Sequence, residues 1–132
     1  MRLQKEEVRE VAALTDSLFE KFESEVMSYI VNEEPKISDV LKCQYKSAKV
    51  ISREFSGKGF FTDYVIENRS MKVPSEFKTL GNLQVSFKDL KYGAGFVLFI
   101  DDGLISMLEG YTYGEPWPED ITGYSFHPDG VI

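Results

Sequence analysis

The chain has 132 residues, a mass of 15.1 kDa and a formal net charge of -7, which fits one soluble domain over residues 1–132. No run approaches the roughly 18 apolar residues of a membrane span, so a bilayer-spanning protein is excluded. The first ten residues are charged with no apolar block behind them, so we expect no secretory signal and a cytoplasmic location. The single cysteine, Cys43, excludes an internal disulfide.

Charge is unevenly distributed along the chain. Residues 1–91 hold all 15 basic residues and 15 of the 22 acidic ones, whereas residues 92–132 hold seven carboxylates and no Lys or Arg. Such an acidic segment repels phosphate backbones and anionic lipid and attracts basic surfaces. We therefore expect no nucleic-acid or membrane partner and a basic protein as the favoured partner.

Residues 3–31 are predicted to form one long amphipathic helix. Apolar side chains recur there every three or four residues, at Val8, Val11, Leu14, Leu18, Phe22, Val26 and Tyr29. Asn32 and Pro35 end the pattern, since proline lacks the amide donor and disfavours helix in the residue before it.

From Val40 the pattern alternates, with Leu41, Cys43 and Tyr45 separated by polar residues, which predicts a half-buried strand. Strands over 49–55 and 60–66 follow, joined by a two-residue Gly57-Lys58 turn. In that register, three pairs face one another across the hairpin: Phe55 with Phe60, Arg53 with Thr62 and Ile51 with Tyr64. Residues 67–80 are predicted to be irregular, and a short strand covers 83–87.

A second hairpin is predicted over 96–109, because Asp102-Gly103 is typical of a type I′ turn. Regular pairing puts apolar side chains on both faces: Phe96, Leu98, Ile100, Ile105 and Met107 on one, and Val97, Phe99, Leu104 and Leu108 on the other. A hairpin of this kind lies centrally in a sheet, with the N-terminal helix on one face. The tail, curling of the sheet or a second subunit could cover the other face, and the sequence leaves these three open. The predicted fold is therefore α+β: a long N-terminal helix packed on an antiparallel sheet of about five to six strands.

Glu109 is the candidate acid with a perturbed proton affinity, since the same register places it opposite Phe96 and beside Ile105 and Met107. No second catalytic partner is evident, so we name no catalytic residue.

Metal and cofactor chemistry find no support in the sequence. Asp101 and Asp102 are explained by the turn, and a calcium loop needs several more oxygen ligands. Cys43 and His127 are the only soft ligands, whereas a structural zinc site uses four. We expect no metal and no cofactor.

The C-terminal segment after the second hairpin carries the candidate binding residues. Two prolines flank its tryptophan, so it is predicted to be a loop. Aromatic rings among carboxylates either fold back over the sheet or form a protein-binding patch. The candidate residues are Tyr111, Tyr113, Glu115, Trp117, Glu119 and Asp120.

Two segments resemble a known group of sequences: REFSGKGFFTDY, residues 53–64, and GAGFVLFIDDGLISMLEGYTYGEPWPED, residues 93–120. They are similar to small uncharacterised bacterial proteins with a GFFT-type hairpin followed by an LFxxDGxxxxLEGYTYGE-type hairpin. The resemblance implies no activity for any residue. In size, charge and organisation the chain is also similar to the immunity partners of bacterial toxins.

Three hypotheses follow for the function. The first is a non-catalytic protein-binding module, in one form an immunity-type inhibitor, that captures a basic partner. The second is a small enzyme or ligand-binding protein with a carboxylate pocket near Glu109. The third is a homodimeric structural protein, in which the apolar hairpin face meets its copy.

Overall fold

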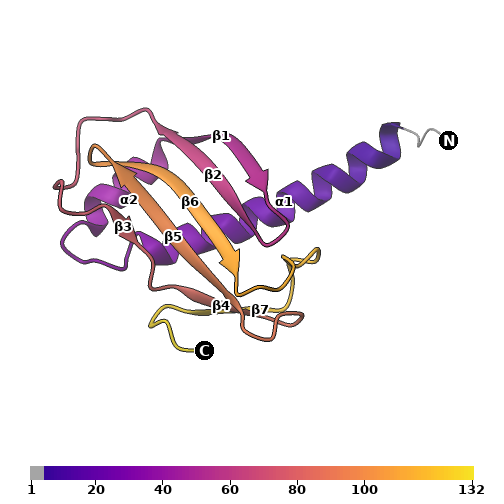
Figure 1. Ribbon diagram of the computed structural model, residues 1–132. Coiled ribbons are helices and arrows are strands. Elements are labelled where there is room, and N and C mark those ends of the chain that lie inside the picture. The colour runs from indigo at the N-terminus through magenta and orange to yellow at the C-terminus, as the bar shows by residue number, and fades with distance from the viewer. Residues whose placement is uncertain (1–4) are drawn as a thin grey trace.

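The computed structural model describes the backbone of residues 5–132 and the side chains of residues 17–132. In that part of the chain, two helices, α1 (Lys5–Ile30) and α2 (Ser38–Lys46), lie on the same face of one antiparallel sheet (Figure 1). The predicted α+β class is therefore confirmed. Neither described helix combines the length and the apolar character needed to cross a bilayer.

Within residues 5–132 the sheet has seven strands instead of the five to six predicted, in the order β1-β2-β6-β5-β4-β7, with β3 pairing with β5. One predicted strand is lost to α2, and two unpredicted strands appear. β3 has only two residues, too few for a periodic pattern, and β7 pairs with β4 from about 40 residues away. The strands are β1 (Ala48–Phe55), β2 (Gly59–Ile66), β3 (Thr79–Leu80), β4 (Gln84–Phe87), β5 (Ala94–Asp101), β6 (Leu104–Thr112) and β7 (Tyr124–His127).

The strand predicted at Leu41, Cys43 and Tyr45 is wrong, because these residues belong to α2. Leu41 and Gln44, three residues apart, are the buried pair of this helix, which is helical spacing. The alternation misled because it rested on treating Gln44 as a solvent-facing polar residue. Gln44 is 1% exposed.

Gln44 joins α2 to the turn of the β5–β6 hairpin. Its side-chain amide donates to the carbonyls of Gly103 (2.8 Å) and Met71 (3.0 Å), and its Oε1 accepts from the backbone N–H of Ile105 (2.9 Å). One buried side chain thus bonds three backbone groups, of which the Gly103 carbonyl also accepts from the backbone N–H of Val73 (3.0 Å) and the Met71 carbonyl belongs to an exposed residue.

Replacing Gln44 by Leu should lower the free energy of unfolding by about 2 kcal/mol, because the volume is nearly kept while the buried N–H of Ile105 loses its bond to Oε1 and two carbonyls lose a donor. Chemical denaturation with a constant m-value measures the change. Lys42→Leu, at an exposed position of the same helix, is the control and should change stability by less than about 0.5 kcal/mol. Equal effects of the two variants would contradict the role assigned to the amide.

The β1–β2 hairpin keeps part of its predicted register. Phe55 pairs with Phe60 and Arg53 with Thr62 as expected, but Tyr64 pairs with Val50 instead of Ile51. A bulge between Val50 and Ser52 causes the shift, and it leaves Ile51 66% exposed at the edge of the sheet.

The β5–β6 hairpin has the predicted turn, with positive φ at Asp102 (51°) and Gly103 (74°). Beyond the turn, a bulge at Ser106 makes Phe99 pair with Met107, one residue later than regular pairing requires. Every side chain after Ser106 therefore changes face relative to the prediction: Leu108 is fully buried, and Met107 lies on the opposite side of the sheet.

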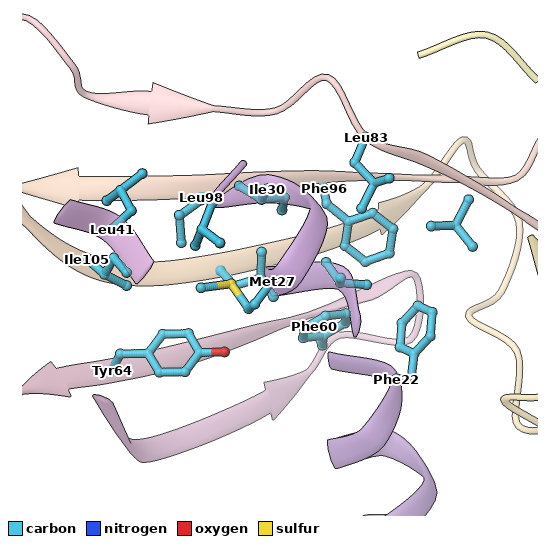
Figure 2. Close-up of a cluster of buried hydrophobic side chains, with 14 of the residues drawn as sticks. Phe22, Met27, Ile30, Leu41, Phe60, Tyr64, Leu83, Phe96, Leu98 and Ile105 are labelled. Carbon is cyan, nitrogen blue, oxygen red and sulfur yellow. The ribbon is translucent and has the colours of Figure 1, made fainter. Parts of the chain in front are cut away.

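The hydrophobic core lies between the helices and the sheet (Figure 2). Phe22, Met27 and Ile30 of α1 meet Phe60 and Phe96 of the central strands. Among the described side chains of the predicted stripe, Phe22 and Val26 are buried in this core, whereas Leu18 and Tyr29 are 41% and 40% exposed. The part of the stripe at Val8, Val11 and Leu14 lies outside the described side chains.

Candidate protein-binding surface

The face of the sheet opposite the helices carries no covering helix among the described residues, and Figure 1 shows this face turned toward the viewer. Neighbouring strands bring three side chains into a row there, because Phe61 of β2 pairs with Glu109 of β6, which pairs with Val97 of β5. A second row joins Asp63, Met107 and Phe99. All six are half-buried. We call these residues the outer patch: Phe61, Asp63, Val97, Phe99, Met107 and Glu109.

Two of the predicted binding residues border this patch. Tyr111 lies across Gly95, where an added Cβ would come within 2.5 Å of the tyrosine ring. Its ring meets that of Tyr113 edge-on, with the centroids 5.6 Å apart, and the hydroxyl of Tyr113 donates to Oε1 of Gln84 at 2.7 Å. Burial raises the pKa of Tyr111, and Tyr113 remains 48% exposed. The outer patch thus ends in two ordered aromatic rings.

The charges of the outer patch have one sign. Its two ionisable residues, Asp63 and Glu109, are both carboxylates, and Glu54 on β1 pairs with Phe61 at its border. Asp63 accepts a hydrogen bond from the hydroxyl of Ser52 at 2.8 Å. Lys49 lies further along β1 and forms an ion pair with Glu67 at 2.7 Å. The exposed apolar surface is therefore combined with negative charge that no cation inside the patch neutralises.

Glu109 does not occupy the environment predicted for it. The bulge at Ser106 places it opposite Val97, whereas Phe96 and Ile105, its expected neighbours, lie in the core on the other side of the sheet. The carboxylate belongs to an open sheet face, where solvent reaches it. The site therefore offers no carboxylate enclosed by apolar walls at this residue.

The other predicted binding residues lie away from the outer patch. Glu115 accepts hydrogen bonds from the backbone N–H groups of Lys91 (3.0 Å) and Tyr92 (3.2 Å), so it holds a loop in place. The ring of Trp117 lies on the helix side of the sheet, 5.2 Å from Phe60 and 5.8 Å from Phe87 between centroids. Replacing Trp117 by Ala would therefore disturb stability along with any binding.

The carboxylates of the C-terminal third are also separated. Asp101 and Asp102 lie at the β5–β6 turn, where Asp102 forms an exposed ion pair with Lys72 at 2.9 Å. Glu119 and Asp120 are exposed at the other end of the sheet, beside the β1–β2 hairpin, where the N–H of Trp117 donates to the Gly57 carbonyl (2.8 Å). The segregation of charge along the sequence thus does not become one acidic face.

A buried ion pair missed from the sequence joins α1 to the sheet. Glu23 is 3% exposed and accepts two hydrogen bonds from Arg53, at 2.7 and 3.1 Å, and one from the hydroxyl of Thr62 at 2.6 Å. This hydrogen bonding raises the pKa of Arg53, and burial raises the pKa of the neighbouring Tyr64. The predicted pairing of Arg53 with Thr62 was the available signal, since it put a charged and a polar residue on the face that α1 covers. These contacts indicate a structural role, because the Glu23 carboxylate accepts its three hydrogen bonds from side chains of the sheet.

Comparison of the chain with protein-family models, curated proteins and solved structures finds no match. The function is therefore argued from the surface itself.

Proposed function

We propose that the protein is a non-catalytic binding module that captures a basic partner protein on the outer patch. The observation that carries the proposal is the composition of this surface. Apolar side chains, among them Phe61, Phe99 and Met107, lie half-buried around two carboxylates, and the patch contains no positively charged residue. Aromatic and Met anchors supply contact area in protein interfaces, and complementary charge steers the encounter. An immunity-type inhibitor is a module of this kind.

The charge of the patch favours a basic partner over a second copy of the chain. A two-fold contact between two outer patches would bring Asp63 and Glu109 against the carboxylates of the other copy. Like charges in a desolvated contact cost free energy, and no Lys or Arg in the patch offsets them. A partner carrying Lys or Arg around an apolar centre meets no such penalty.

Glu109→Lys should weaken the capture of the partner at least ten-fold, which is about 1.4 kcal/mol, because it places a cation at the centre of the patch. The immobilised protein is exposed to an extract of its source cells, a retained protein is identified, and its affinity for wild type and variant is measured by calorimetry at two salt concentrations. The wild-type affinity should fall as salt rises.

Asp129→Lys is the matched control, since it makes the same charge change at an exposed position near the C-terminus. It should leave the affinity within about two-fold of wild type. The proposal fails if no basic protein is retained, or if the Lys variants at 109 and 129 behave alike. It also fails if light scattering shows a dimer that Glu109→Lys dissociates, because the patch would then be an interface between copies.

A further inference from the structure

A second surface feature lies at the end of the sheet on the helix side, separate from the outer patch. A cavity of about 580 Å³ opens there between α1, the β1–β2 hairpin and the segment after β6. Figure 1 shows that segment beside the end of the hairpin and close to α1. The rings of Phe19, Phe55 and Trp117 line the cavity together with Ile121, and Glu119 is its charged lining residue.

The aromatic rings around the cavity are held by one another. Phe19 meets Phe55 edge-on at 5.2 Å between centroids, and Phe60 lies behind them, 4.8 Å from Phe19 and 5.2 Å from Trp117. Phe55 is nevertheless 58% exposed, although phenylalanine is usually buried when a core can take it. The cavity therefore offers a preformed aromatic surface to solvent.

The electrostatics of the cavity select the charge of a ligand. Glu119 is exposed, and Asp120 follows it in the chain. The ring of Phe19 already has a cation over it, since the guanidinium carbon of Arg53 lies 5.6 Å from its centroid. That charge is neutralised by the two hydrogen bonds from Arg53 to Glu23. An anion would meet Glu119 with no free cation among the described residues of the cavity wall, whereas a cation would meet both the carboxylate and the π-electrons of the rings.

We propose that this cavity binds a small alkylammonium ion, with the methyl groups against Phe19, Phe55 and Trp117 and the charge facing Glu119. Aromatic surfaces combined with a carboxylate favour quaternary ammonium groups, because such cations spread their charge over an apolar surface and shed water at low cost. This activity goes beyond the capture of a protein on the outer patch and uses different residues.

Trp117 is the single tryptophan of the chain, so its fluorescence reports directly on the cavity. The intact protein is titrated with choline and with 3,3-dimethylbutan-1-ol, which has the same shape and no charge. We expect a saturable change in emission with choline and an affinity at least about ten-fold lower for the neutral alcohol. Equal responses to the two compounds, or no saturable response to choline, would overturn the proposal.

Two variants at exposed positions test the assignment without removing core side chains. Glu119→Gln and Phe55→Leu should each lower the affinity for choline at least about three-fold. Glu109→Gln and Phe99→Leu make the same changes on the outer patch and should leave it unchanged. If the two outer-patch variants lose affinity for choline and the two cavity variants do not, the ion binds elsewhere and the proposal is contradicted.

A peptide that carries trimethyl-lysine distinguishes the sources of the cation. Tighter binding of the peptide than of choline assigns the alkylammonium group to a protein side chain, and tighter binding of choline assigns it to a free metabolite. Glu109→Lys should not affect either titration, so a failure of partner capture and a failure of cation binding are separable.

Discussion

Replacing Arg53 by Met should lower the free energy of unfolding by about 3 to 5 kcal/mol, because it leaves the Glu23 carboxylate buried without its cation. Glu23 is 3% exposed, and Arg53 supplies two of the hydrogen bonds to its carboxylate. Denaturant unfolding at neutral pH, followed by circular dichroism, measures the loss.

A double replacement separates the ion pair from the packing of its side chains. Glu23→Leu combined with Arg53→Met removes both charges, so most of the lost stability should return, apart from about 1 kcal/mol for the hydroxyl of Thr62. Lys49→Met on the same strand is the control, since its ion pair with Glu67 is exposed and should contribute less than about 1 kcal/mol. A double variant as unstable as Arg53→Met would show that the burial of an unpaired charge is not the cause.

Phe22→Ala should cost about 3 to 5 kcal/mol, because it removes a fully buried aromatic ring from the contact between α1 and the sheet. The ring of Phe22 lies 5.5 Å from Phe87, 5.8 Å from Phe96 and 5.0 Å from Tyr124 between centroids. It therefore links the helix to three strands, and its removal leaves a cavity among them. Thermal and denaturant unfolding both report this change.

Leu18→Ala is the matched control on the same helix. Leu18 is 41% exposed, so its truncation should cost at most about 1 kcal/mol. Similar losses for the two variants would mean that the described part of α1 does not pack on the sheet through the face that Phe22 occupies.

The error over residues 41–45 shows how a single buried polar residue can reverse a prediction of secondary structure. If Gln44 is assumed to face solvent, apolar and polar residues alternate along the segment as in a strand. Because Gln44 is buried, it instead shares the buried face of a helix with Leu41. The partners that make its burial favourable, Gly103 and Ile105, lie 59 and 61 residues further along the chain. No local pattern contains that information.

The two bulges explain why register was predicted well near each turn and poorly beyond it. The turn conformation at Asp102 and Gly103 is set by these two neighbouring residues, so both positive φ angles were predicted from the sequence. The extra residue at Ser106 lies next to Met107, which pairs with Asp63 of the distant strand β2 as well as with Phe99 of β5. Since one inserted residue exchanges the faces of a strand, it moved Glu109 from the predicted apolar pocket to the outer patch.

None of the six predicted binding residues belongs to the outer patch, although two of them border it. The sequence indicated an apolar hairpin face that the N-terminal helix does not cover, and it singled out Tyr111 and Tyr113, which border that face. It could not show that Trp117 turns to the helix side of the sheet, because that depends on contact with Phe60, 57 residues earlier. The cation cavity was missed for the same reason, since its wall combines residues from three distant segments.

The sequence by itself determined the α+β class, the two hairpin turns and the positions of most strands, because periodicity and turn geometry are set by residues next to one another. Tertiary structure alone decided the identity of α2, the positions of the bulges and the separation of the C-terminal carboxylates into distinct sites. These features arise from hydrogen bonds and packing between segments far apart in the chain, where burial fixes which face of a helix or strand turns inward.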